Sequence, residues 1–199
     1  HLESFGFARN RLMHVFLYAS MTQDLGADAV KTLGGLPRWG VTPSDPMGTT
    51  MRRIDGTLGG NRIVTRTCAT FQPEMAATEA QLRRTAAVHR AKFDDRFPQL
   101  AGTAMEFTWA GHLCLSRNGV AVMKELESGL YSACVQNGLG TARGTLTGIG
   151  AAELASGVES AITRHFGAED TPAKLPPRPF STIGANTLLR YGEWRAARE

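Results

Sequence analysis

Short apolar runs separated by turn-forming residues dominate the first part of the chain. Residues 13–22 are apolar and aromatic, a composition typical of a largely buried strand. Two more strands are expected at residues 49–54 and 61–67, because the glycine-rich segment 55–60 between them favours a hairpin turn. Residues 37–48 are rich in Pro, Gly, Ser and Asp, which predicts a loop.

Helical periodicity is clearest after residue 73. A helix is expected to start at Pro73 and to end before Pro98, because proline is tolerated in the first turn of a helix but interrupts its interior. One face of this helix is formed by Leu82, Ala86, His89 and Phe93. Residues 24–33 predict a shorter helix that is closed by a pair of glycines.

From residue 103 the pattern changes to short strands and then to a glycine-rich helix. The expected strands cover residues 105–109, 112–116, 120–124 and 130–135. The helix is expected from about Thr141 to Ser156, with another turn or two of helix at 161–165. After Gly167 the chain is proline-rich as far as Phe180, which favours an extended strap. The pattern predicts an α+β protein: an antiparallel sheet with helices, followed by a strand–helix unit.

The glycine-rich helix has glycine at positions 140, 144 and 148. A glycine inside a helix costs about 1 kcal/mol relative to alanine, so three of them at this spacing need a reason. The spacing puts all three on one face, where another backbone or a flat ligand can come close. The start of the helix also presents unpaired N–H groups and a partial positive charge. Two interpretations are open: a helix start that binds an anion or cofactor, and a helix packed tightly on a sheet.

Composition and charge narrow the class of protein. The apolar fraction of 42% is enough for a packed core and argues against disorder. The net charge is only +4 and the basic residues are scattered, whereas a nucleic-acid-binding protein more often has a clustered patch. The apolar run at residues 13–21 is too short to span a bilayer. We therefore expect neither a nucleic-acid partner nor a membrane span.

The sequence contains no self-contained catalytic or metal motif. Cys68, Cys114 and Cys134 are odd in number and lack metal-ligand spacing, which is typical of a reducing compartment, so a cytoplasmic location is expected. There is no Gly-x-Ser-x-Gly elbow, no His-Glu-x-x-His pair and no Gly-x-x-x-x-Gly-Lys loop. We assign no catalytic residue, which is what an enzyme that relies on a cofactor would show.

The order of motifs after residue 108 resembles a known family. Trp109-Ala110-Gly111 is followed by a short strand, by Ser116-Arg117-Asn118, by a hairpin and by a glycine-rich turn at 137–141. This order is similar to the C-terminal part of the D-amino-acid-oxidase-like flavoenzymes, which include glycine oxidase, sarcosine oxidase and gamma-glutamylputrescine oxidase. Asn118 is similar to the gamma-glutamylputrescine oxidase branch, which also has asparagine where the other members carry aspartate. Segments 18–23, 53–62 and 175–180 resemble the strand that opens the family's substrate domain, its arginine-containing hairpin and its closing strap.

The resemblance implies a fold and a division into domains. Residues 1–104 would form part of a substrate-binding domain with an antiparallel sheet, and 105–168 the closing strand–helix unit of an FAD-binding α/β domain. Residues 169–199 would form a proline-rich C-terminal strap. The strand–Gly-x-Gly-x-x-Gly–helix unit that holds the FAD pyrophosphate in these enzymes does not occur in the sequence. We therefore expect about the C-terminal half of a longer polypeptide, with the dinucleotide-binding half in the same gene product or in a partner chain.

The resemblance places a flavin beside the glycine-rich turn. Residues 137–143 would lie along the pyrimidine edge of the ring, where main-chain amides stabilise the negative charge of the reduced flavin. The cofactor-binding residues that it implies are Gly111, Asn137, Gly138, Leu139, Gly140, Thr141, Ala142 and Arg143. The alternative is a plain strand-to-helix turn without a ligand.

Candidates for the substrate pocket lie outside this turn. Arg53 resembles the arginine of the substrate-domain hairpin, which could hold a carboxylate through its guanidinium; an exposed strand arginine is the alternative. Met51 points the same way from the same strand and could line the pocket or pack in the core. His112 could face the flavin or the substrate, or could be structural.

Two departures from the family bear on the substrate. The arginine that holds the substrate carboxylate in glycine oxidase falls at Leu113, and the lysine with this role in sarcosine oxidase falls at Gly144. A small α-amino acid held at those positions is therefore not expected. A larger amine or an N-substituted amine fits better, unless the other half supplies an anchor.

The resemblance implies part of an FAD-dependent oxidoreductase that oxidises the C–N bond of an amine or amino acid to an imine, with oxygen as acceptor. One alternative is a dehydrogenase that passes electrons to a quinone or a partner protein. Two others are a non-catalytic assembly subunit of a flavoenzyme and a standalone α+β binding domain.

Overall fold

A computed structural model describes residues 2–197 of the chain and has the predicted α+β class. Within these residues the strands are β1 (Leu12–Thr22), β2 (Trp39–Val41), β3 (Thr50–Ile54), β4 (Arg62–Phe71), β5 (Met105–Ser116), β6 (Val122–Glu127) and β7 (Leu130–Cys134). The α-helices are α1 (Ala27–Leu33), α2 (Glu79–Arg96), α3 (Gly140–Ala155), α4 (Ala161–Gly167) and α5 (Phe180–Ala196).

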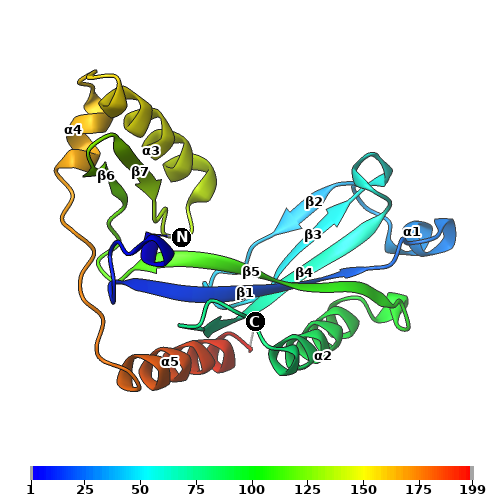
Figure 1. The fold of residues 1–199 in the computed structure, drawn as a ribbon. Coiled ribbons are helices and arrows are strands. Elements are labelled where there is room, and N and C mark those ends of the chain that lie inside the picture. Colours follow the sequence, from blue (N-terminus) through cyan, green and yellow to red (C-terminus); the bar gives the residue numbers. More distant parts are fainter. Residues whose placement is uncertain (1, 198–199) are drawn as a thin grey trace. The chain divides into compact units, whose positions relative to one another are not determined.

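Five of the strands form one antiparallel sheet in the order β2-β3-β4-β1-β5, and β6 pairs with β7 in a separate hairpin (Figure 1). The predicted hairpin between residues 49 and 67 is confirmed, since β3 and β4 pair with Arg52 opposite Val64. The predicted strand at 13–22 is confirmed by β1. Residues 105–116 were expected as two strands and form one, β5, which lies at an edge of the sheet.

The chain divides into two compact units, and each is described here by itself. Unit 1 comprises the chain up to Val15 together with Leu113–Thr182, and unit 2 comprises Phe16–His112 together with the chain from Ile183 onward. The boundary therefore passes through β1 and through β5. This boundary does not coincide with the expected domain boundaries at 104 and 168. Those boundaries refer to a larger protein and stay a prediction.

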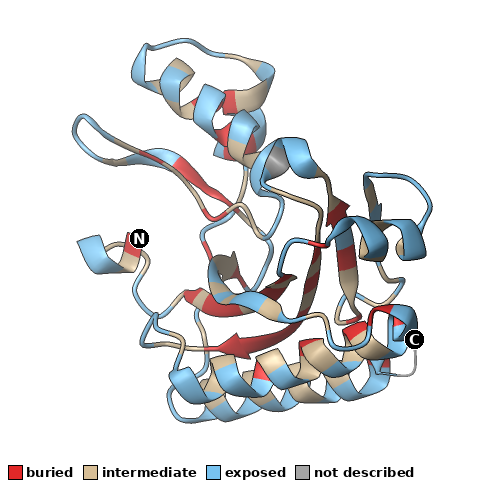
Figure 2. Cartoon of the chain, turned by 90° about the vertical axis from the view of Figure 1, so that its right-hand side faces the viewer, coloured by how far each residue is buried: buried red, intermediate tan, exposed pale blue. Residues whose placement is uncertain are grey.

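In unit 2, α2 covers one face of the sheet. Phe93 is fully buried in a cluster with Met51 and Ile63, and Tyr18 packs in a second cluster with Phe16. The predicted apolar face of this helix is confirmed at His89 and Phe93, both of which are buried. Figure 2 shows buried residues concentrated on the strands and wide exposed faces on the helices.

The start of α2 was predicted wrongly. The helix begins at Glu79 rather than at Pro73, because Thr78 forms a capping box with Gln81. The Thr78 hydroxyl accepts a hydrogen bond from the Gln81 amide, and the Gln81 side chain accepts one from the Thr78 amide. These two bonds satisfy amide donors that would otherwise be unpaired at the helix start, so the capping box determines where the helix begins.

In unit 1, α3 and α4 pack on the β6–β7 hairpin (Figure 1). Met123 and Phe166 are buried in the core between them. Val122 and Val135, from the other face of the hairpin, pack with Leu2 and Leu12. The glycine-rich helix expected from about residue 141 to 156 is confirmed by α3.

Two elements were not anticipated from the sequence. Residues 39–41 of the expected loop form the short strand β2. The expected C-terminal strap is extended only until residue 179, because residues 180–196 form α5.

In unit 2, α5 contacts the last residues of β4: the Asn186 side chain accepts a hydrogen bond from the Phe71 amide and donates one to the Phe71 carbonyl, each at 3.0 Å. The Glu193 carboxylate accepts a bond from the Ala69 amide.

Candidate functional site

The glycine-rich turn before α3 has an unusual backbone. Asn137 and Gly138 both have left-handed conformations, with φ of 52° and 81°, and the Leu139 amide donates to the Gln136 carbonyl at 3.1 Å. Glycine adopts such angles without strain, and asparagine is among the few other residues that do so readily. The pair therefore redirects the chain from β7 into α3 within two residues.

The side chain of Asn137 holds this turn in place. Its carbonyl oxygen accepts a hydrogen bond from the Ser116 amide at 2.7 Å, and its NH₂ group donates to the carbonyls of Val120 and Val135 at 3.0 and 3.1 Å. The ends of β5 and β7 and the approach to β6 are thus joined through one side chain. Asn137 has a structural function whether or not the backbone beside it binds a ligand.

The start of α3 is exposed and has no side-chain cap. The residue before the helix is Leu139, whose side chain cannot accept a hydrogen bond and which is 62% exposed. The first intrahelical bond runs from the Arg143 amide to the Leu139 carbonyl, so the amides of Gly140, Thr141 and Ala142 have no acceptor within the helix. The first turn contains no acidic residue. Three N–H groups and the positive end of the helix dipole are therefore available to an electron-rich group.

The glycine strip on α3 is open in the described part of unit 1. A methyl group added at Gly140 or Gly148 would meet no other atom within 4 Å, and one at Gly144 would make ordinary contact with the Gln136 side chain. The tight packing of this helix occurs instead at Gly150, where an added methyl group would collide with Met123 and Ile162. Within the described residues the strip therefore has little part in the packing of α3.

The outward face of α3 carries no charge. Its exposed residues are small or apolar: Gly140, Thr141, Ala142, Thr145, Leu146, Gly148, Ile149, Ala152 and Ala155. The two charged residues of the helix are turned to other groups. Arg143 donates to the Gly119 carbonyl at 2.7 Å and pairs with Glu169, and Glu153 accepts a bond from Ser160. An uncharged helix face is typical of a surface that becomes covered.

Gly111 lies on β5 in unit 2, next to exposed aromatic residues. A methyl group on Gly111 would come no nearer than 4.0 Å to the Leu17 carbonyl. Because side chains alternate along a strand, Phe107 and Trp109 lie on the same face of β5 as Gly111. They are 47% and 42% exposed. This strip of β5 is accessible to a flat ligand or to another polypeptide.

The three substrate-pocket candidates also lie in unit 2. Met51 is buried in the core beneath α2. Arg53 is buried as well, and its guanidinium donates to the carbonyls of Gly34 and Leu36 at 2.7 and 3.0 Å. The exposed-arginine alternative is therefore wrong, and the charge contacts the backbone of the segment after α1. The His112 ring stacks on Phe16 with a centroid distance of 4.9 Å.

The candidate residues thus fall into two groups. Residues 137–143 lie together in unit 1, whereas Gly111, Met51, Arg53 and His112 lie in unit 2. Within unit 2, Gly111 and His112 are neighbours on an exposed strand, and Met51 and Arg53 are buried on β3. The roles of all these residues toward a cofactor or substrate stay predictions.

A buried polar network in unit 2 was missed from the sequence. His89 Nδ1 lies 2.7 Å from the Ser20 hydroxyl, and its Nε2 lies 3.2 Å from both the amide and the carbonyl of Thr67. Burial lowers the pKa of His89 to about 4, so its ring is neutral. The ring is fully inaccessible to solvent, which makes this pair a structural link between α2 and the sheet rather than a nucleophile and its base.

Comparison with protein-family models and with curated proteins finds no match for this chain. Among residues 2–197, no helix combines the length and the apolar character that crossing a bilayer requires.

Proposed function

We propose that this chain is part of an FAD-dependent oxidoreductase that oxidises the C–N bond of an amine or amino acid to an imine, with oxygen as the acceptor. The observation that carries the proposal is the exposed, uncapped start of α3, where three amides have no acceptor within the helix. Together with the motif order after residue 108, this feature supports a site for an electron-rich ring edge.

The residues of the turn fit the flavin in charge and in shape. A bound flavin would supply the redox chemistry by taking a hydride from the carbon that bears the nitrogen. The amides of Gly140, Thr141 and Ala142 would donate hydrogen bonds to the edge on which negative charge accumulates. The absence of side chains at Gly138 and Gly140 leaves room for a ring close to the backbone. The side chain of Arg143 is paired with Glu169. Arg143 would therefore contribute through its place in the first turn of the helix rather than through its side chain.

The exposed apolar surface supports the second part of the proposal, a dinucleotide-binding half that covers this chain. Phe107 and Trp109 in unit 2, and Leu139, Leu146 and Ile149 in unit 1, are each more than two-fifths exposed. Exposed apolar patches mark interaction sites more often than free surface. The covering half would also supply the pyrophosphate-binding unit.

Isolation of the native complex tests the proposal. We expect a yellow preparation with a co-purifying dinucleotide-binding polypeptide or segment, and bleaching of its visible spectrum by an amine substrate under anaerobic conditions. Peroxide formed per substrate oxidised in air would be near one for an oxidase and near zero for a dehydrogenase. A colourless preparation without such a polypeptide would contradict the proposal and favour the non-catalytic subunit.

A further inference from the structure

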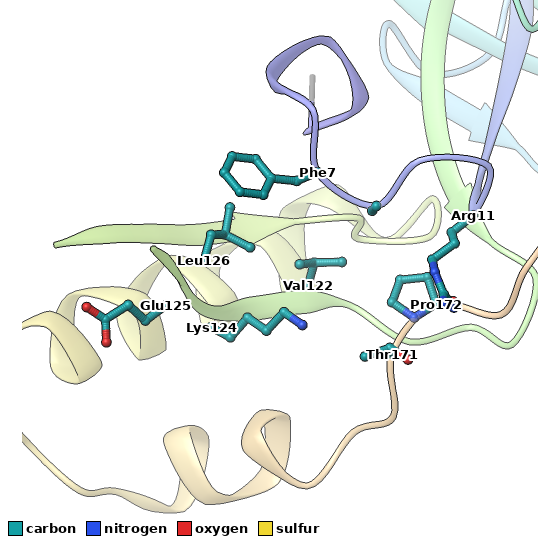
Figure 3. Close-up of a pocket in the computed structure, with 9 residues that line it drawn as sticks. Phe7, Arg11, Val122, Lys124, Glu125, Leu126, Thr171 and Pro172 are labelled. Carbon is teal, nitrogen blue, oxygen red and sulfur yellow. The ribbon is translucent and has the colours of Figure 1, made fainter. Parts of the chain in front are cut away.

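A small cleft in unit 1 lies between the N-terminal segment, β6 and the extended strap (Figure 3). Its volume is about 270 Å³. Phe7 and Arg11 line it from the N-terminal segment, Val122, Lys124, Glu125 and Leu126 from β6, and Pro172 from the strap. None of residues 137–143 lines it, so the cleft is distinct from the proposed flavin contact.

The strap side of the cleft is fixed by several hydrogen bonds. Arg11 Nη1 donates to the Pro172 carbonyl at 2.6 Å, and the Leu175 amide donates to the Asn10 carbonyl at 2.8 Å. The Asn118 side chain donates to the Thr171 carbonyl and accepts from the Ala173 amide. These bonds hold an otherwise irregular segment against the unit. The cleft is therefore formed before any ligand arrives, as is usual for small-molecule sites.

Part of the cleft lining is apolar. Val122 is 3% exposed and belongs to the core cluster against which Phe7 and Leu126 pack. Pro172 adds an aliphatic ring from the strap (Figure 3). Filling the cleft with a hydrocarbon group would remove these surfaces from water, which is favourable.

Two cations meet at this apolar surface. Lys124 lies on the same face of β6 as Val122, and Figure 3 shows its ammonium directed along the cleft toward the strap and Arg11. Among the described residues, no carboxylate forms an ion pair with Lys124 or Arg11. Glu125 also lines the cleft, but its carboxylate accepts a bond from the Gly129 amide, and Glu3 accepts from the Arg11 amide rather than from its guanidinium.

We propose that this cleft binds a small organic carboxylate with an aliphatic tail. The carboxylate would lie between the Lys124 ammonium and the free N–H groups of Arg11, and the tail would lie on Val122, Leu126 and Phe7. An inorganic anion would leave the apolar walls in contact with water, and a neutral hydrocarbon would leave two cations without a counterion. The combination of an anionic head and an apolar tail satisfies both parts of the surface.

Calorimetric titration of the purified full-length protein with sodium hexanoate tests this inference. We expect saturable binding that Lys124→Met weakens at least tenfold, because the substitution removes the charge and keeps the apolar volume. The same variant should bind hexan-1-ol no more weakly than the unmodified protein. Lys31→Met, which changes an exposed lysine in unit 2, should leave hexanoate binding unchanged.

Three outcomes would overturn the proposal: no hexanoate binding, binding that survives Lys124→Met, or inorganic phosphate binding as tightly as hexanoate. Circular dichroism of the variant verifies that it is folded. The proposal does not depend on a flavin, since the titration has no redox readout.

Discussion

His89 shows how one buried side chain makes the stability of the protein depend on pH. Its neutral ring joins Ser20 of β1 to Thr67 of β4, and burial lowers its pKa from 6.5 to about 4. The unfolded chain therefore binds a proton at a higher pH than the folded chain does. The stabilisation is fully present above pH 6.5 and is lost as the pH falls from 6.5 toward 4.

We expect the free energy of unfolding to fall by about 2 kcal/mol between pH 7 and pH 5 because of this residue alone. Urea unfolding at the two pH values measures the difference, and His89→Gln should reduce it by that amount. An unaltered pH dependence in His89→Gln would contradict the assignment.

We expect opposite effects on stability from alanine substitutions at Gly150 and at Gly148, which lie two residues apart in α3. We expect Gly150→Ala to destabilise the protein by about 1–2 kcal/mol, because overpacking against Met123 and Ile162 exceeds the gain in helix propensity. Gly148→Ala meets open space, so it should be neutral or stabilising by up to about 1 kcal/mol. Thermal unfolding of both variants checks this, and equal effects would contradict the packing.

At the scale of elements, the start of α3 is where the structure bears most on function. Its position followed from the glycines and from the change in periodicity, and the structure agrees within one residue. The start of α2 lies after Pro73 because the Thr78–Gln81 capping box, which is also readable in the sequence, satisfies the amides at the helix start. The helix α5 was missed because glycines at 184 and 192 weaken its propensity. Its hydrogen bonds to β4 are tertiary and leave no local signal.

Removal of one amide at the start of α3 tests the proposed charge stabilisation. Thr141→Pro deletes a single N–H, and proline is tolerated in the first turn, particularly after a glycine that lacks a Cβ. We expect the rate of substrate oxidation to fall on the order of 100-fold. Thr141→Ala retains the amide and should keep most of the activity. Equal activity of the two variants would contradict a role for this amide.

Asn186 tests the attachment of α5 to the end of β4. We expect Asn186→Leu to leave the amide and carbonyl of Phe71 without these partners and to destabilise the protein by about 1–3 kcal/mol. Hydrogen exchange at the Phe71 amide should accelerate in this variant. Thr187→Leu, at the adjacent exposed position, should have neither effect. Unchanged exchange at Phe71 would mean that the two bonds do not hold the helix.

At the scale of the whole molecule, the α+β class and the strand–hairpin order could be predicted because they depend on local periodicity and turn chemistry. The division into two units could not, because their boundaries pass through the middle of β1 and β5. The candidate site was located by motif order, but its accessible surface could be recognised only in three dimensions. The sequence likewise gave no indication that Arg53 is buried against backbone carbonyls, or that Lys124 and Arg11 share a cleft.

A crystal structure of the purified flavin-containing complex is the most direct test of the central claim. We predict that the pyrimidine edge of the ring lies within hydrogen-bond distance of the amides of Gly140, Thr141 and Ala142, with Gly148 facing the covering half. A ring bound elsewhere, or a turn at 137–140 sealed by polypeptide with no flavin beside it, would contradict the account.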